Sequence, residues 1–529
     1  MPELLHDLLV QQAAVRPDAI AVSQGPLSLS YAALEEQVRA VAQGLLKLGL
    51  SGSERVAVYL PKRLETVSAL FSIARAGGVF VPINPLLKAD QVAYILSHCS
   101  VRVLLTSHDR LLALEPALES CHDLRSVVLV DAPEDVTLRQ THRDCLSWSE
   151  LTAEKAVLPT VRRIDKDMAA ILYTSGSTGK PKGVVLSHRN LLSGAASVAQ
   201  YLGNHSQDSL LAVLPLSFDA GFSQLSTAFS VGARVVLMEY LLARDVLNQV
   251  VLEGITGMTA VPTLWIQLAA MEWPEEAQSR LRYVANTGGA MPGAVVAGLR
   301  RVLPRTQVFL MYGLTEAFRS TYLPPAELDR RPDSIGKAVP NAEVLVVRED
   351  GSLCAVGEPG ELVHRGATVA LGYWNDPQST GLRFRPAPNQ PAGLPLPELA
   401  VWSGDTVRMD EDGFLYFVGR RDDMIKSSGY RISPTEVEEV LYASGLVDEA
   451  VALGVPHPLL GQAVVTVVKP GQETLDTAEL VGYCRRRLPG FMVPVRVVCR
   501  TSLPRNPNGK FDRRQLLDEL RQMFANSSV

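Results

Sequence analysis

Ten residues in the first half of the chain combine hydroxyls, glycines and lysines in a pattern suited to phosphate. They read Tyr173-Thr174-Ser175-Gly176-Ser177-Thr178-Gly179-Lys180-Pro181-Lys182 and follow the apolar run 168–172. Glycines let main-chain N–H groups approach an anion, hydroxyls add neutral donors, and lysines supply positive charge. The pattern predicts a loop that leaves a buried strand and binds the phosphates of a nucleoside triphosphate.

Two other interpretations explain this segment less well. A Walker A loop has Ser or Thr after Gly-Lys, whereas here Pro181 follows Lys180 and removes a main-chain donor. A solvated Ser/Gly turn is common for four such residues, but it is rare for the whole string directly after a strand. The phosphate loop is therefore the favoured interpretation.

Further residues suited to chemistry lie downstream. Tyr312, Thr315 and Glu316 follow the predicted strand 308–311, and ligands of open α/β sheets bind at the carboxyl ends of strands. Lys510 ends a segment rich in Asn, Pro and Gly, where a lysine has no packing role. A cation on such a loop can be delivered to a developing negative charge.

The elements that must position these residues follow from hydrophobic periodicity. Short β-rich runs alternate with amphipathic stretches from about residue 55 to 311, which predicts parallel sheets covered by helices. Shorter strands with hairpin signals predict antiparallel β structure at 342–417. After residue 420 a separate α+β unit is predicted, with a helix that begins at Ser433-Pro434-Thr435-Glu436.

Length and composition restrict the function further. A chain of 529 residues exceeds a single core, so at least two domains are expected. The net charge of −5 argues against a nucleic-acid surface, and no apolar run reaches membrane-spanning length. Six scattered cysteines without a Cys-x-x-Cys pair indicate neither a disulfide framework nor a zinc site. A cytoplasmic protein with small-molecule or protein partners is therefore expected.

These motifs, taken together, resemble those of the adenylate-forming ligases, which include acyl-CoA synthetases, nonribosomal-peptide adenylation domains and firefly luciferase. The resemblance extends from end to end, with each motif in the family's order. The motifs are Leu29-Ser30-Tyr31, 76–82, 173–182, 312–316, Gly360-Glu361-Leu362, Gly372-Tyr373, Ser403-Gly404-Asp405, 419–436 and Asn508-Gly509-Lys510.

The resemblance implies an α/β fold in two parts. A large N-terminal domain, 1–420, would contain packed parallel-rich sheets with helices and a distorted β-barrel subdomain at about 340–418. A small mobile α+β domain, 421–529, would follow and would rotate between two half-reactions. In the first, a carboxylate attacks the α-phosphorus of ATP to give an acyl-adenylate and pyrophosphate. In the second, a pantetheine thiol takes the acyl group.

The resemblance also implies a role for each motif residue. Lys510, Thr315, Glu316 and Thr174 would be catalytic, Glu316 would bind Mg²⁺, Asp422 would be the hinge and Gly429 would line the thiol tunnel. The ATP site would comprise Thr174, Ser175, Gly176, Ser177, Thr178, Gly179, Lys180, Lys182, Gly289, Ala290, Tyr312, Thr315, Asp405, Arg420 and Lys510. The substrate pocket would comprise Phe218, Asp219, Ser223, Thr287, Met311, Arg319 and Ser320.

Two interpretations of the substrate stay open. The segment 214–220 resembles amino-acid pockets, in which the aspartate matching Asp219 pairs with an ammonium. An ion pair between Asp219 and Arg319 would instead satisfy this carboxylate without any amine. The small or medium size of the other pocket residues favours a modest acid, and Leu310 departs from the asparagine that many peptide-synthetase domains carry there.

The thiol acceptor is also open. Only 19 residues follow Lys510, so the thiol is expected from outside the chain. The leading interpretation is a ligase that activates a small amino acid or short acyl acid for a separate carrier protein. The alternatives are a short- or branched-chain acyl ligase that uses coenzyme A, a luciferase-like oxygenase and a non-catalytic relative, and the intact motifs disfavour the last.

Overall fold

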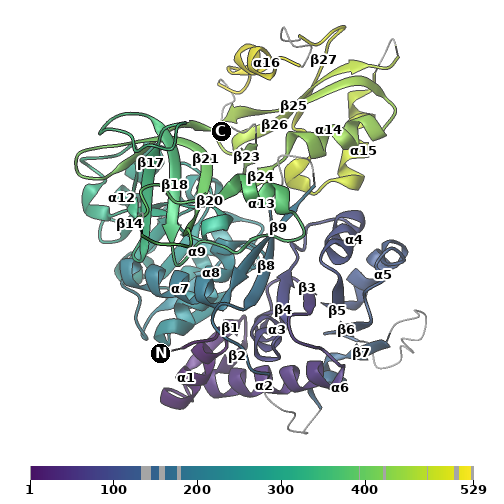
Figure 1. Ribbon diagram of the computed structural model, residues 1–529, viewed down its shortest axis with the longest axis vertical. Coiled ribbons are helices and arrows are strands. Elements are labelled where there is room, and N and C mark those ends of the chain that lie inside the picture. The colour runs from purple at the N-terminus through teal and green to yellow at the C-terminus, as the bar shows by residue number, and fades with distance from the viewer. Residues whose placement is uncertain are drawn as a thin grey trace.

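The fold consists of a large N-terminal domain and a small C-terminal domain, seen below and above in Figure 1. The computed structural model describes residues 2–132, 144–153, 161–174, 180–391, 393–420, 424–472, 475–504 and 511–525. Among the helices of these residues, none combines the length and the apolar character that a membrane span requires.

The first sheet of the large domain is mainly parallel. Its inner strands are runs of Val, Leu and Ala that are buried on both faces, as expected for a sheet covered by helices. From edge to edge the eight strands are β19 (Gly372–Tyr373), β9 (Lys182–Ser187), β8 (Met168–Thr174), β4 (Val79–Pro82), β3 (Arg55–Tyr59), β5 (Val101–Thr106), β6 (Ser126–Leu129) and β7 (Asp144–Ser147).

The second sheet has 14 strands, parallel in one half and antiparallel in the other. The order is β17 (Ala342–Val347), β18 (Gly360–Gly366), β21 (Leu399–Met409), β22 (Leu415–Arg420), β16 (Ser334–Ala338), β15 (Thr321–Leu323), β14 (Gln307–Tyr312), β13 (Tyr283–Asn286), β12 (Gly257–Ala260), β10 (Ser209–Ala212), β11 (Arg234–Leu237), β1 (Ile20–Gln24) and β2 (Leu27–Ser30), with β20 (Phe384–Pro386) paired to β21.

The antiparallel half corrects one expectation. A distorted β-barrel was predicted at about 340–418, but among the described strands of this segment no barrel closes. Strand β22 pairs with β16, which pairs with β15, so the antiparallel strands extend the parallel sheet. Closure depends on pairing between distant strands, and hairpin signals in a sequence do not determine that pairing.

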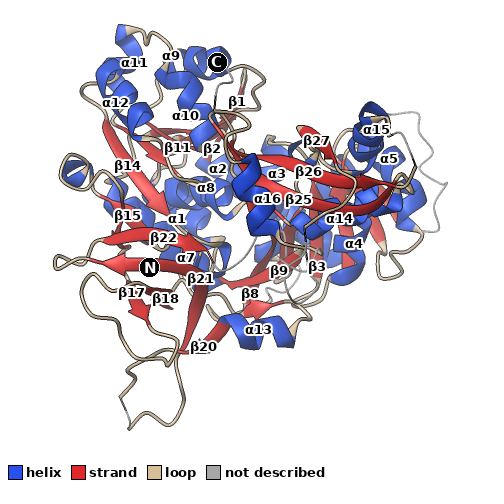
Figure 2. Cartoon of the chain, turned by 90° about the horizontal axis from the view of Figure 1, so that it is seen from above, coloured by secondary structure: helices blue, strands red, loops and turns tan. Residues whose placement is uncertain are grey.

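One apolar core joins both sheets and the helices against them. The rings of Phe71 and Phe222 stack with centroids 6.0 Å apart, and Phe229 meets Phe71 edge-on. Figure 2 shows the helices set around the strands. In the large domain they are α1 (Asp7–Val15), α2 (Tyr31–Lys47), α3 (Leu64–Arg75), α4 (Ala89–His98), α5 (His108–Leu118), α6 (Trp148–Thr152), α7 (His188–Leu202), α8 (Asp219–Val231), α9 (Ala243–Leu252), α10 (Pro262–Ala269), α11 (Glu275–Arg280), α12 (Gly293–Val302), η1 (Thr315–Ala317), η2 (Pro325–Glu327) and α13 (Pro377–Arg383).

The small domain packs helices on a five-stranded sheet. Its elements are β23 (Ile425–Ser427), β24 (Tyr430–Ile432), α14 (Pro434–Ala443), β25 (Val447–His457), β26 (Gly461–Pro470), α15 (Thr477–Arg487), η3 (Gly490–Met492), β27 (Arg496–Cys499) and α16 (Arg513–Leu520). Helix α14 begins as predicted, because the Ser433 hydroxyl accepts a hydrogen bond from the N–H of Glu436 and Pro434 occupies the first turn.

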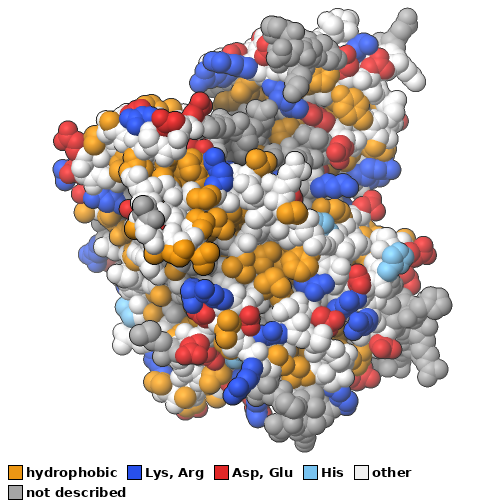
Figure 3. Space-filling view, in the orientation of Figure 1, with side chains coloured by type: hydrophobic (Ala, Val, Ile, Leu, Met, Phe, Trp, Pro, Cys, Tyr) orange, Lys and Arg blue, Asp and Glu red, His pale blue; other side chains and the backbone are white. Residues whose placement is uncertain are grey.

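Charged side chains of both signs are interspersed on the face shown in Figure 3. This distribution agrees with the modest net charge of −5.

Candidate functional site

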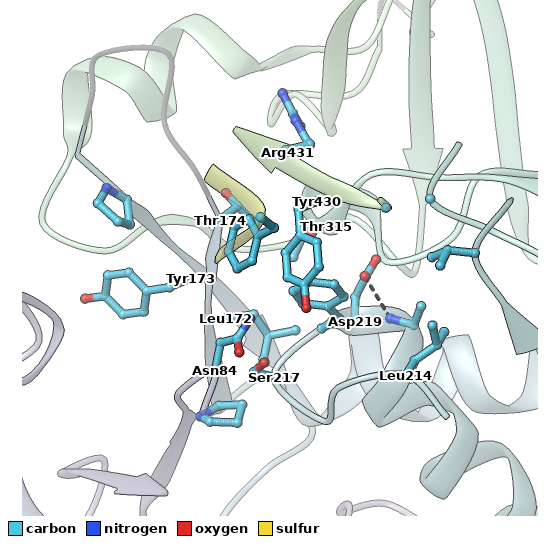
Figure 4. A pocket seen from close by; sticks show the side chains of 18 of the residues that line it. Asn84, Leu172, Tyr173, Thr174, Leu214, Ser217, Asp219, Thr315, Tyr430 and Arg431 are labelled. Atoms are coloured by element: carbon cyan, nitrogen blue, oxygen red, sulfur yellow. Dashed lines mark hydrogen bonds between the residues drawn. The ribbon is translucent and has the colours of Figure 1, made fainter. Parts of the chain in front are cut away.

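A cavity lies where the carboxyl ends of several strands of the large domain meet the small domain (Figure 4). The β8 end, the β10–α8 loop and the segments after β13 and β14 contribute its walls, together with β23, β24 and α14 of the small domain. The lining residues include Asn84, Leu87, Gln91, Leu172, Tyr173, Thr174, Leu214, Ser217, Phe218, Asp219, Ala220, Val261, Thr287, Gly288, Gly313, Leu314, Thr315, Arg319, Lys426, Gly429, Tyr430, Arg431, Glu436, Phe491 and Met492.

The residues expected around adenine and ribose lie together at the junction of β14 with the antiparallel strands. The Tyr312 hydroxyl donates a short hydrogen bond to the buried Asp405 carboxylate. Asp405 faces Arg420 across the β21–β22 ladder. The carbonyl of Gly289 accepts a hydrogen bond from Asn286 at 2.8 Å, which fixes the loop that leads to Ala290. This grouping is compatible with the predicted nucleotide contacts.

Glu316 is a buried carboxylate of which only one oxygen accepts a hydrogen bond from a described residue. Its Oε1 accepts a hydrogen bond of 2.6 Å from Tyr373, and Arg383 Nε lies 4.0 Å away. Burial opposes ionisation, but the charges of Arg383 and Arg431 and the bond from Tyr373 hold the pKa of Glu316 below its usual value. Within the described residues, Oε2 has no hydrogen-bond partner. An ionised carboxylate with an unused buried oxygen fits Mg²⁺, which needs few protein ligands when phosphates supply the others.

The ends of the phosphate loop are fixed by a hairpin. Thr174 and Lys182 face each other across β8 and β9. Lys182 Nζ lies 2.6 Å from the Ser379 hydroxyl and 3.8 Å from Asp376, and Lys180 lies over the Tyr94 ring. Both lysines therefore lie on the C-terminal side of the segment 175–179, opposite Thr174.

Asp219 and Arg319 meet at the wall of the cavity. Arg319 Nη1 is 3.5 Å from Asp219 Oδ2, and it also donates to the Phe318 carbonyl at 3.1 Å. Burial raises the pKa of Asp219, and the charge of Arg319 offsets only part of that rise. Phe218 and Thr287, two of the predicted pocket residues, line the cavity. The predicted pocket residues Ser223, Met311 and Ser320 are buried and are not among the described lining residues.

The small domain closes the cavity with the loop 427–431. Tyr430 stacks on Phe491 with centroids 3.7 Å apart and meets Phe218 of the large domain edge-on at 5.0 Å. Gly429 lies against Gly288 and Val261, so this predicted tunnel residue borders the cavity. Both glycines have a left-handed backbone, with φ of +77° at Gly288 and +83° at Gly429, which favours glycine at each position.

Glu436 also lines the cavity, whereas its sequence context predicts only the start of a helix. Its Oε1 accepts a hydrogen bond of 2.9 Å from Gln91 of α4, across the domain interface. Burial raises the pKa of Glu436 to about 7. Its position at N3 of α14 could not reveal this role, because the partner helix lies 345 residues away in the sequence.

Several predicted residues lie outside the described part of the chain. They are Ser175, Gly176, Ser177, Thr178, Gly179, Asp422 and Lys510, and the side chain of Arg420 is not described either. Their roles stay predictions.

Comparison with known protein families identifies both domains. The model of the AMP-binding enzyme family matches residues 9–374, and that of the AMP-binding enzyme C-terminal domain matches 436–510. An L-proline–[L-prolyl-carrier protein] ligase of Pseudomonas fluorescens is 32% identical over 97% of this chain and 98% of its own length. Gramicidin S synthase 2 of Brevibacillus brevis is 31% identical over 97% of this chain, and the match spans 11% of that protein.

Among solved structures, o-succinylbenzoate CoA synthetase of Bacillus subtilis, 27% identical, resembles the chain in two complexes. With a CoA product analogue, in a double mutant, the TM-score is 0.83, with 97% of this chain and 98% of that one covered. With the acyl-adenylate intermediate the TM-score is 0.68, with 96% and 97% covered. The overall arrangement of this chain is therefore more similar to that of the product-analogue complex than to that of the adenylate complex.

Proposed function

The chain belongs to the AMP-binding enzyme family, and on that premise we propose that it activates an amino acid with ATP and transfers it to the phosphopantetheine thiol of a separate carrier protein. The observation that carries the proposal is Asp219, a partly buried carboxylate, 17% exposed, at the cavity wall. The carrier-protein ligase, similar over nearly its whole length, supports the same conclusion.

The first half-reaction would take place at the large domain. A carboxylate oxygen of the amino acid forms a bond to the α-phosphorus of ATP, and the bond to the bridging oxygen of pyrophosphate breaks. Thr174, Lys180 and Lys182 would hold the outer phosphates with the loop between them, and Tyr312 and Asp405 would hold the nucleoside. Mg²⁺ bound at Glu316 would neutralise triphosphate charge.

Lys510 would stabilise the negative charge that develops as pyrophosphate leaves. Asp422 would then act as the hinge that lets the small domain rotate. In the second half-reaction the thiol sulfur forms a bond to the acyl carbon, the bond to the AMP oxygen breaks, and the thiol proton leaves to a base. The greater similarity to the product-analogue complex supports the interpretation that the described arrangement serves this step.

A coenzyme A ligase is the second candidate. The observation that favours it is the similarity to a CoA synthetase over 97% of the chain. Both candidates share the adenylation step, and they differ in the thiol acceptor and in whether the acid is an amino acid or a short- or branched-chain acyl acid. A cytoplasmic location is part of either proposal, supported by six cysteines that form no disulfide among the described residues.

The test has two stages. Pyrophosphate exchange over a panel of amino acids and their desamino analogues identifies the acid. Single-turnover transfer from the enzyme-bound adenylate then compares a carrier protein bearing phosphopantetheine with coenzyme A at equal concentration. Faster loading of the carrier protein supports the proposal, whereas faster formation of acyl-CoA establishes the second candidate.

A further inference from the structure

Arg319 is a buried cation at the cavity whose donors are only partly used. Its side chain is 4% exposed, and Nη1 donates to the Phe318 carbonyl and, at the long distance of 3.5 Å, to Asp219. Arg319 Nε is buried and has no partner among the described residues. The Arg319 side chain also donates a hydrogen bond to the Tyr201 hydroxyl, but burial raises the pKa of Tyr201 to about 12, so this phenol is neutral and supplies no counter-charge. A guanidinium offers five N–H donors in a planar fork, so Arg319 keeps donors for a ligand in the cavity that it lines.

The backbone before Arg319 is held in an unusual conformation. Phe318 has φ 58° and ψ −52°, a combination that costs a non-glycine residue about 1–3 kcal/mol. Its ring packs on Gly194 of α7 so closely that a Cβ at Gly194 would lie 2.2 Å from the ring. This packing holds the strained turn, and the turn directs Arg319 to the cavity. Strain of this kind is concentrated at binding and catalytic sites.

Asp219 alone is a poor partner for this cation. The single contact between the two side chains is longer than a charge-assisted hydrogen bond, which measures about 2.7–2.9 Å. The Asp219 carboxyl accepts its closest hydrogen bond, 2.7 Å, from the N–H of Ala220. The two charges are therefore near each other but are not joined in the bidentate geometry that carboxylate and guanidinium adopt when each satisfies the other.

Charge balance separates three classes of substrate. An amino acid with a neutral side chain would draw Asp219 to its ammonium and leave Arg319 a buried cation without a counter-ion, which is costly. A desamino monoacid would leave the free donors of Arg319 unused. An amino acid with a second carboxylate gives Asp219 an ammonium and Arg319 an anion, so each buried charge gains an opposite charge.

We infer that the acid activated in this cavity is an amino dicarboxylic acid, whose ammonium binds Asp219 and whose second carboxylate binds Arg319. The inference rests on the proposed function, because it names the substrate of the same adenylation site. The carboxylate that does not react lies at the guanidinium, and the reacting carboxylate lies toward Thr315 and the phosphates.

The first experiment uses the unmodified full-length protein. Pyrophosphate exchange is measured with L-aspartate, L-glutamate and L-2-aminoadipate, with the side-chain amides asparagine and glutamine, with alanine and proline, and with succinate and glutarate. We expect one dicarboxylic amino acid to exceed its amide and its desamino analogue by at least about a hundredfold in kcat/KM, because a site built for a polar group rejects analogues that lack it.

The second experiment uses Arg319→Gln, with Arg189→Gln as the matched control, since Arg189 pairs with Asp165 on the surface of the large domain. Arg319→Gln keeps a donor but removes the charge. We expect this substitution to reduce the ratio of kcat/KM for the dicarboxylic amino acid to kcat/KM for its amide to below about tenfold, whereas the control keeps the wild-type ratio. If Arg319 had only a structural role, the substitution would lower kcat/KM for all substrates together and would leave the ratio of dicarboxylate to amide unchanged.

The outcomes are distinguishable. Preference for a neutral amino acid or a desamino acid overturns the inference, while adenylation itself stands. The absence of exchange with every acid overturns the proposed function as well. If Arg319→Gln does not fold, the wild-type preference still decides, because an amide accepted as well as its acid is incompatible with a carboxylate at Arg319.

Discussion

Gly429 offers a direct test of whether the described arrangement of the domains serves thiol transfer. A Cβ added at this position would lie 2.4 Å from Val261 Cγ1 of the large domain, well inside van der Waals contact. Gly429 belongs to the small domain, so the overlap exists only while the two domains have this arrangement. Gly429→Ala should therefore impair thiol transfer and spare adenylation.

The magnitude follows from separating two effects of the substitution. Alanine at φ +83° costs about 1–2 kcal/mol, but that backbone strain stays within the loop and is present in either domain arrangement. The overlap with Val261 adds about 1–3 kcal/mol, as overpacking does in cores. Only this second cost opposes domain closure, and it corresponds to a loss of roughly 5- to 160-fold in transfer rate.

Gly445→Ala is the matched control. Gly445 is also in the small domain with a left-handed φ of +68°, but a Cβ there would have no neighbour within 4 Å. Pyrophosphate exchange measures adenylation, and single-turnover release of AMP from supplied acyl-adenylate and thiol measures transfer. If Gly429→Ala transfers as fast as Gly445→Ala, or if it loses both activities equally, the assignment of this arrangement to thiol transfer is wrong.

Three further predictions follow from the site. Lys510→Ala should reduce pyrophosphate exchange by about a hundred- to a thousandfold and leave transfer from supplied acyl-adenylate intact, because this lysine is expected to act only in the first step. Glu436 has a pKa of about 7 against 4.5 when exposed, since burial outweighs its bond from Gln91 and a nearby Glu439 adds repulsion. The closed arrangement is therefore fully stabilised below about pH 4.5 and loses that stabilisation as pH rises through about 7. Glu436→Gln should flatten this decline in the transfer rate, and Glu479→Gln, at an exposed position of the small domain, should not. Asp219→Ala should lower kcat/KM for the best amino acid at least about a hundredfold and for its desamino analogue hardly at all, and equal losses would refute the ammonium contact.

The sequence predicted those parts of the fold in which the local pattern of apolar and β-branched residues determines the secondary structure. The runs of β-branched and apolar residues in β3 (Arg55–Tyr59) and β5 (Val101–Thr106) form strands, as such residues predict. Strand β12 was not predicted, because Gly257-Met258-Thr259-Ala260 has little intrinsic β preference and is held by parallel neighbours on both sides. Tertiary pairing overrode the local preference there.

In the candidate site, too, motif residues could be predicted from the sequence, whereas contacts between distant segments could not. Asp219 and Glu316 could be located because each belongs to a motif in the segment that follows a strand, β10 or β14. The contact of Glu436 with Gln91 could not, since it depends on how one domain sits on the other. The contact between Asp219 and Arg319 was expected as one alternative, but its length and the unused Arg319 Nε became visible only in three dimensions.

The pairing of opposite charges at the cavity bears on recognition more than on stability. A buried ion pair seldom stabilises a fold, because the cost of desolvating both ions can exceed their attraction, and apolar side chains of similar volume do as well or better. At a cavity wall the same pair sets the charges that a ligand must carry. An Asp219 with a raised pKa and an Arg319 with unused donors are each incompletely satisfied, so a ligand that supplies both missing charges binds with the least cost.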